Sequence, residues 1–180
     1  MKRRSLLVLG ILTLLILLFL AGPRVTVEHR PYAEVLPDDL ISHLAASEAA
    51  YPDITPGAEK TIIWANPQHQ QTELAIVYLH GFSATRQETA PLCDDLAISL
   101  AANLFYTRLT GHGRSNAAMA EASAGDWLKD AEEALAIGKR LGRKVIIIGT
   151  STGGTLATWL AATQNDPQVL AYVLLSPNFA

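Results

Sequence analysis

The chain has 180 residues, 49% of them hydrophobic, and a formal net charge of −3 at pH 7. This length and apolar content suit one domain with a hydrophobic core. The slightly acidic balance excludes the basic surface that is typical of nucleic-acid-binding proteins. Cys93 is the single cysteine, so an internal disulfide is excluded.

The N-terminus combines positive charge with a long apolar run. Three basic residues at positions 2–4 precede the stretch from Leu6 to Ala21. An uncleaved signal anchor and a secretory signal peptide share this pattern, but a cleavage site needs small residues where Phe19 and Leu20 stand. We therefore predict a transmembrane signal anchor over residues 1–23, with a cytoplasmic N-terminus and the rest outside the cytoplasm. Cleavage, giving a secreted or periplasmic protein, is the alternative.

Beyond a linker and helix in residues 24–58, the pattern predicts an α/β fold. Strands are expected over 60–64, 73–79, 103–107, 144–148 and 169–175, and helices over 37–51, 88–101, 124–141 and 152–163. A polar turn between the first two strands predicts an antiparallel hairpin. From residue 103 onward, strands alternate with helices, which predicts right-handed crossovers and a mostly parallel, doubly wound sheet covered on both faces.

The most informative motif lies between the fourth strand and the helix that follows it. Residues 149–153 read Gly-Thr-Ser-Thr-Gly, a Gly-x-Ser-x-Gly motif in the strand-to-helix context of a nucleophile elbow. Such a sharp turn exposes the Ser151 hydroxyl and leaves no space for side chains at Gly149 and Gly153. Gly154 allows the helix to pack closely. We predict that Ser151 is a catalytic nucleophile.

A phosphate-binding turn is the rival interpretation of this segment. That motif requires Gly-Lys followed by Ser or Thr, whereas Gly154 is followed directly by Thr155. The dinucleotide pattern Gly-x-Gly-x-x-Gly is missing here as well. The sequence therefore favours a serine nucleophile over a nucleotide site.

Two loops after other strands carry further candidate site residues. His80, Gly81 and Phe82 end the second strand, and the Phe82 N–H is predicted to form an oxyanion hole with the Thr152 N–H at the helix N-terminus. His112 lies in a loop beyond the third strand, where binding crevices of parallel sheets are found. His80, Gly81 and His112 are candidates to line the substrate, and a structural turn is the alternative for each loop.

The order and spacing of these three loops resemble the α/β-hydrolase superfamily. The resemblance covers roughly residues 60–180 and is closest to the branch of monoglyceride lipases, lysophospholipases and serine aminopeptidases. It implies that Ser151 is the nucleophile and that the Phe82 and Thr152 amides bind the oxyanion. Relatives often carry an Asp three residues before the glycine that is Gly111 here, where this chain has Arg108.

The resemblance also implies an acid and a histidine after the nucleophile, in the chain order Ser, Asp or Glu, His. After Ser151, the only acid is Asp166, and there is no histidine. We therefore expect residues 59–180 to be the N-terminal part of a hydrolase domain and the 180-residue chain alone to be inactive.

These observations predict a membrane-anchored serine hydrolase, similar to carboxylesterases or lipases, that forms an acyl-enzyme on Ser151. Acylglycerols or lysophospholipids are the expected esters, by analogy with the branch that the chain resembles. No metal or organic cofactor is expected, and the expected partners are a lipid or small-molecule ester and the membrane. The alternative is a non-catalytic binding or scaffold protein on a degenerate hydrolase fold.

Overall fold

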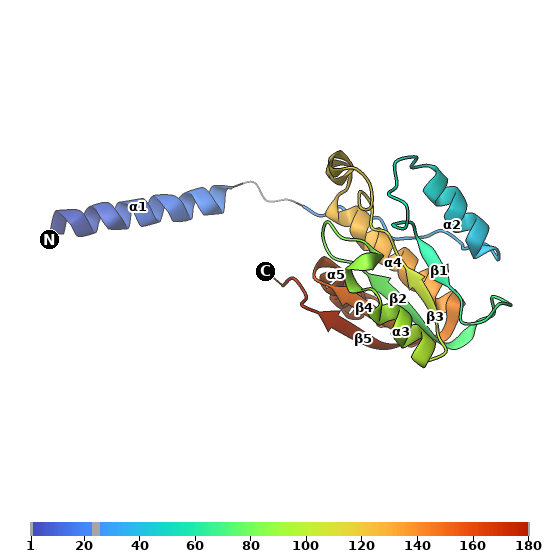
Figure 1. Ribbon diagram of the computed structural model, residues 1–180. Coiled ribbons are helices and arrows are strands. Elements are labelled where there is room, and N and C mark those ends of the chain that lie inside the picture. Colours follow the sequence, from blue (N-terminus) through green and yellow to red (C-terminus); the bar gives the residue numbers. More distant parts are fainter. Residues whose placement is uncertain (1, 23–25, 180) are drawn as a thin grey trace.

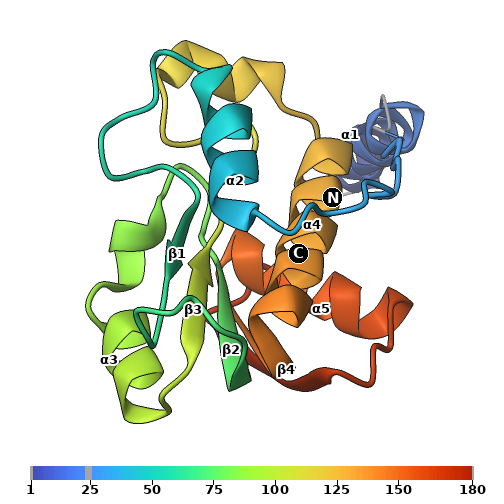
Figure 2. The ribbon, with the colours of Figure 1, turned by 90° about the vertical axis from the view of Figure 1, so that its right-hand side faces the viewer.

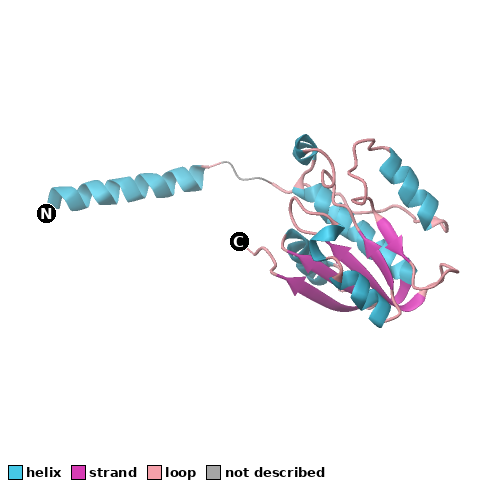
Figure 3. Cartoon of the chain, in the orientation of Figure 1, coloured by secondary structure: helices cyan, strands magenta, loops and turns pink. Residues whose placement is uncertain are grey.

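The computed structural model describes residues 2–22 and 26–179 and contains one mixed sheet flanked by helices (Figure 1, Figure 3). The strands are β1 (Thr61–Ile63), β2 (Thr72–Leu79), β3 (Asn103–Tyr106), β4 (Gly142–Thr150) and β5 (Val169–Leu175). The α-helices are α1 (Lys2–Ala21), α2 (Leu40–Ala49), α3 (Leu92–Ser99), α4 (Ala124–Leu141) and α5 (Thr152–Thr163). Short 3-10 helices are η1 (Arg86–Thr89) and η2 (Asn116–Glu121).

The strand order is β1-β3-β2-β4-β5, and the last four strands in the chain are parallel as predicted. The predicted hairpin between the first two strands is wrong, because β1 pairs antiparallel with β3, with Ile62 opposite Phe105. The run Ala75–Leu79 is buried on both faces, which is typical of a central strand. Both edges of β2 are occupied by the parallel neighbours β3 and β4, so β1 takes the outer edge of β3.

Helices cover both faces of the sheet, which confirms the doubly wound arrangement. Alternate residues of β2 divide between the faces: Ala75, Val77 and Leu79 belong to the core beneath α4, α5 and α2. Ile76 and Tyr78 belong to the core beneath α3. Figure 2 shows α3 on one side of the strands and α4 with α5 on the other. The alternation follows from the two-residue period of side chains along a strand.

The chain reverses its direction across the sheet at β2. It moves from β2 to β3 on one side, and α4 then carries it across to β4 on the other side. The carboxyl ends of β2 and β4 are therefore neighbours, with Leu79 opposite Gly149 in the register. In open α/β sheets, binding crevices form at such a reversal. The loops after β2 and β4, which contain the predicted site residues, leave the sheet at this point.

The expectation of a transmembrane segment over residues 1–23 is not supported. Within residues 2–22 and 26–179, no helix combines the length and the apolar character that crossing a bilayer requires. The apolar run from Leu6 to Ala21 in α1 has about 16 residues, which gives about 24 Å of helix against a hydrocarbon core of ~30 Å. The predicted single-pass location, with the domain held outside the cytoplasm, is corrected for the same reason.

Candidate active site

Ser151 lies at a sharp turn between β4 and α5, as the motif predicts. Its backbone angles are φ 49° and ψ −112°, a conformation that residues other than glycine rarely adopt. The Ser151 N–H donates to the Leu175 carbonyl at 2.9 Å, and its carbonyl accepts from the amides of Thr155 at 3.1 Å and Asn178 at 3.2 Å. Contacts on both sides thus hold the strained turn in place, with the Ser151 residue half-buried.

The three glycines of the turn lie where a β-carbon has no space. A β-carbon on Gly149 would overlap the backbone of Gly153, and one on Gly153 would overlap the Leu79 carbonyl. A β-carbon on Gly154 would lie 2.9 Å from the Pro177 Cβ. The N-terminus of α5 is therefore pressed against the end of β2, which only glycine permits.

The two amides predicted to bind an oxyanion, those of Phe82 and Thr152, lie just beyond the ends of the neighbouring strands β2 and β4. Thr152 is the first residue of α5, so its N–H has no acceptor within the helix. The Phe82 amide, two residues after the buried His80, has no hydrogen-bond partner in the part of the chain that the structure describes. Both N–H groups are thus free to donate to a ligand at the carboxyl edge of the sheet.

His80 is fully buried, and backbone groups occupy both of its ring nitrogens. Nδ1 lies 2.9 Å from the Gly81 carbonyl, and Nε2 accepts from the Leu109 N–H at 3.1 Å. This pattern assigns the ring proton to Nδ1 and the neutral state to the imidazole. Burial lowers the pKa of His80 to about 4, and the neighbouring His112 and Arg108 act in the same direction. His80 thus joins the ends of β2 and β3, and neither nitrogen is free to act as a base.

The lowered pKa of His80 predicts a specific dependence of stability on pH. Between its folded value of about 4 and its ordinary value of 6.5, the unfolded chain binds a proton at His80 that the folded chain does not. Stability should therefore rise with pH through this window. From about pH 5 to pH 6.5, we expect His80 to contribute a gain of about 2 kcal/mol in the free energy of unfolding. Urea titrations of the wild type and His80→Gln measure it: equal pH slopes for the two proteins would contradict the assignment.

His112 lies in an aromatic cluster with His80, Phe82 and Trp127. Its ring centroid is 4.9 Å from His80, 5.9 Å from Phe82 and 5.5 Å from Trp127. His112 Nδ1 lies 3.2 Å from the Thr110 carbonyl, and the buried Nε2 has no partner within the described chain. Burial lowers the pKa of His112. The ring therefore packs as a neutral aromatic group beneath Phe82, whose side chain is 60% exposed.

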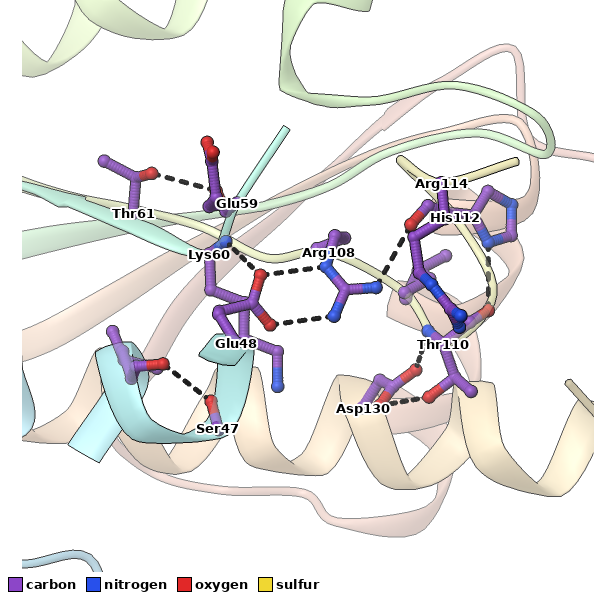
Figure 4. A network of polar contacts seen from close by, with 12 residues as sticks. Ser47, Glu48, Glu59, Lys60, Thr61, Arg108, Thr110, His112, Arg114 and Asp130 are labelled. Carbon is purple, nitrogen blue, oxygen red and sulfur yellow. Dashed lines mark hydrogen bonds and ion pairs between the residues drawn. The ribbon is translucent and has the colours of Figure 1, made fainter. Parts of the chain in front are cut away.

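Arg108 joins α2 to the loop after β3 (Figure 4). Its guanidinium makes two hydrogen bonds of 2.8 Å to the two carboxylate oxygens of Glu48. A third bond of 3.1 Å reaches the His112 carbonyl. On the other side of the loop, Asp130 accepts from the Thr110 N–H at 2.6 Å and the Thr110 hydroxyl at 3.1 Å. Burial raises the pKa of Asp130 to about 6.

Sequence reasoning missed Glu48, Asp130 and Trp127 as supports of this loop. Glu48 belongs to α2, and Asp130 and Trp127 belong to α4, where their spacing fits an ordinary amphipathic helix. The Trp127 indole N–H donates to the Thr110 carbonyl at 3.0 Å. No motif marks these residues, because their partners lie far away in the sequence.

The fold and these loops can now be compared with known proteins. A sequence model of the family described as serine aminopeptidase, S33, matches residues 70–180. The chain belongs to the S33 family. This membership confirms the resemblance to the α/β-hydrolase superfamily that the three loops indicated.

Individual relatives of this S33 chain include lipolytic enzymes. It is 29% identical over 93 residues to a thermostable monoacylglycerol lipase of Bacillus sp. (strain H-257), covering 52% of this chain and 37% of the lipase. A structure from a study of the metagenome-derived lipolytic enzymes LipS and LipT matches with 26% identity and a TM-score of 0.60, over 69% of this chain and 47% of that one. The ferulic acid complex of Est1E from Butyrivibrio proteoclasticus shares the fold, with a TM-score of 0.53 at 19% identity, over 66% and 48%. The S33 chain thus spans less than half the length of these relatives.

Asp166, the one acid after Ser151, is engaged elsewhere in this S33 chain. Its carboxylate accepts from the Lys139 ammonium at 2.6 Å and from the Gln168 N–H at 2.8 Å. Desolvation raises its pKa, but these hydrogen bonds outweigh that effect and leave the pKa below its usual value. Asp166 therefore holds the turn before β5 against the end of α4.

Proposed function

We propose that the chain is the nucleophile-bearing part of a serine esterase. The observation that supports this most is the strained turn at Ser151, where a half-buried serine directly precedes the first amide of α5 and the helix N-terminus lies against the end of β2, from which the Phe82 loop continues. Strain at such a turn persists only where the surrounding structure holds it, and it concentrates at active sites. The lipolytic relatives support an ester substrate, and the exposed Phe82 offers an apolar contact for its acyl or alcohol group.

The reaction begins when the Ser151 oxygen attacks the carbonyl carbon of the ester. A general base accepts the hydroxyl proton, and the Phe82 and Thr152 amides stabilise the negative charge on the carbonyl oxygen. The bond to the alcohol oxygen then breaks, and the alcohol leaves with the proton that the base returns. Water attacks the acyl-enzyme in the same manner and releases the carboxylic acid.

The base and its acid are proposed to come from a part of a longer protein that follows residue 180. No histidine follows Ser151 in this chain, and His80, which directly follows β2 beside the end of β4, uses both ring nitrogens for backbone contacts. With such a segment in place, acylglycerols and lysophospholipids are the substrates we propose. The monoacylglycerol lipase among the relatives supports the first of these.

Added imidazole offers a direct test with the 180-residue chain, because it can replace a missing histidine as the proton acceptor. We expect a fluorophosphonate probe to label Ser151, forming the oxygen–phosphorus bond as fluoride leaves and imidazole takes the proton. The labelling rate should rise about tenfold or more with imidazole. Ser151→Ala should abolish labelling, as measured by intact-protein mass spectrometry.

Ser176→Ala is the matched control, since Ser176 also has a positive φ, of 46°, but lies beyond β5. This variant should be labelled like the wild type. Labelling that persists in Ser151→Ala contradicts the assignment of the nucleophile. Absence of imidazole-dependent labelling in the wild type contradicts the esterase proposal and favours the binding or scaffold protein.

A further inference from the structure

A chain of side-chain hydrogen bonds joins the Phe82 loop to the turn that carries Ser151. The Glu88 carboxylate in η1 accepts from the Gly81 N–H at 2.9 Å and from the Tyr78 hydroxyl at 2.8 Å, both at Oε2. The Tyr78 oxygen lies 3.0 Å from the Thr150 hydroxyl. We call this set of four residues, Gly81, Glu88, Tyr78 and Thr150, the Glu88 bridge.

The direction of each bond follows from the number of protons available. Tyr78 has one hydroxyl proton, and burial raises the pKa of Tyr78, so the proton stays on the oxygen and is donated to the Glu88 carboxylate. The Thr150 hydroxyl must then donate to the Tyr78 oxygen. Each donor in the bridge thus has an acceptor, and a charged acceptor makes such bonds stronger than neutral ones.

The two ends of the bridge lie one residue away from the proposed oxyanion donors and nucleophile. Gly81 directly precedes Phe82, and Thr150 directly precedes Ser151. The Phe82 ring packs edge-on against His112 and Trp127 on one side, but the side chain remains 60% exposed. Beside these ring contacts, the bond from Gly81 to Glu88 and the His80–Leu109 bond are the polar contacts that fix the loop relative to the sheet.

Glu88 also decides which amide of the loop faces a ligand. Its carboxylate packs against Gly81, where an added β-carbon would lie 2.7 Å from Oε1, and it takes up the Gly81 N–H. The Gly81 amide is thus directed towards Glu88, and the next amide, that of Phe82, remains without a protein partner among the described residues. The Phe82 amide is thereby left available as the loop donor of an oxyanion hole whose other donor is the first amide of α5.

We propose that the Glu88 bridge positions the Phe82 amide against Ser151 and Thr152, and that Glu88 is a positioning residue for ester cleavage. This inference rests on the proposed function, in that the two amides are taken to bind the oxyanion. Glu88 touches neither substrate nor the reacting atoms. Loss of the bridge should therefore slow the chemical step and leave binding of the ester or probe unchanged.

The test measures fluorophosphonate labelling of the 180-residue chain with imidazole, separating the maximal rate of inactivation from the probe concentration at half-maximal rate. Glu88→Ala and Tyr78→Phe should lower the maximal rate about 10- to 100-fold with the half-saturating concentration unchanged. Glu88→Gln should stay within about threefold of the wild type, because its amide oxygen can still accept from both donors.

Tyr106→Phe is the matched control for general damage to this face of the sheet. Tyr106 packs edge-on against Tyr78 at 5.9 Å, and its hydroxyl donates to Asp94 at 2.8 Å. The Tyr106→Phe variant therefore loses the same kind of bond, keeps the ring, and leaves every hydrogen bond of the Glu88 bridge in place. Its labelling rate should equal that of the wild type. Wild-type rates in Glu88→Ala, or an equal loss in Tyr106→Phe, would overturn the positioning role.

Hydrogen exchange separates failure of this inference from failure of the proposed function. The Gly81 amide should exchange faster in Glu88→Ala than in the wild type, and at the wild-type rate in Tyr106→Phe. If the wild type is not labelled at all, the esterase proposal fails, yet the exchange of Gly81 still tests the bridge. If the wild type is labelled and Glu88→Ala matches it, the bridge has no positioning role while the esterase proposal stands.

Discussion

Replacing Gly153 with alanine is expected to lower the free energy of unfolding by about 3 kcal/mol or more, at the upper end of what overpacking costs. The new β-carbon would overlap the Leu79 carbonyl and approach the His80 carbonyl, which are backbone groups at and just beyond the end of the central strand β2. Neither can rotate away, so α5 and the turn at Ser151 must move from β2. Urea unfolding followed by circular dichroism measures the loss.

Gly10→Ala is the matched control for this substitution. Gly10 lies in α1, and a β-carbon there has no neighbour within 4 Å. Because alanine has a higher helix propensity than glycine, the control should keep the stability of the wild type or exceed it by less than about 1 kcal/mol. A Gly153→Ala protein as stable as this control would show that the contact between α5 and β2 is looser than described.

Removing the charge of Glu48 is expected to destabilise the protein by about 3 kcal/mol. In Glu48→Gln, the Arg108 guanidinium, 4% exposed, keeps its charge in the interior and loses the carboxylate that faces two of its nitrogens. The free energy of unfolding from urea titrations measures the cost. Hydrogen exchange in the loop from Leu109 to Ser115 should increase as well, because Arg108 also holds the His112 carbonyl.

Two further variants separate burial of the charge from loss of an ion pair in general. In the double variant Glu48→Met with Arg108→Met, most of the stability should return, because no unpaired charge remains inside. Asp38→Asn removes the partner of Arg140 in an exposed pair, and its cost should stay below about 1 kcal/mol. Equal costs for Glu48→Gln and Asp38→Asn would contradict the burial argument.

The sequence was sufficient for those parts of the fold and site that depend on local pattern. The range of α4 and that of α5 followed from helical periodicity and capping residues, and the turn at Ser151 followed from its glycines. The pairing of β1 with β3 could not be predicted in this way. A short strand of three residues carries no register signal of its own, and its neighbour is chosen by which edge of the sheet remains free.

The supports around the site were beyond sequence reasoning for a related reason. The Arg108–Glu48 bond spans 60 positions, and the bond between Tyr78 and Thr150 spans 72. Such partners meet only when the sheet has formed, and a single sequence contains nothing that pairs them. The transmembrane prediction for residues 1–23 is wrong for a different reason: among the described residues, no helix joins sufficient length to sufficient apolar character.

The backbone conformation of Ser151 has a consequence for how this protein can change. A residue held at φ 49° and ψ −112° adopts a conformation that L-amino acids disfavour, so the backbone is strained where its proposed chemistry takes place. Selection for robustness and selection for turnover therefore act in opposite directions at this one position. Substitutions that raise thermal stability should therefore be found elsewhere, on the outer faces of α4 and α5, because they leave the turn at Ser151 unchanged there.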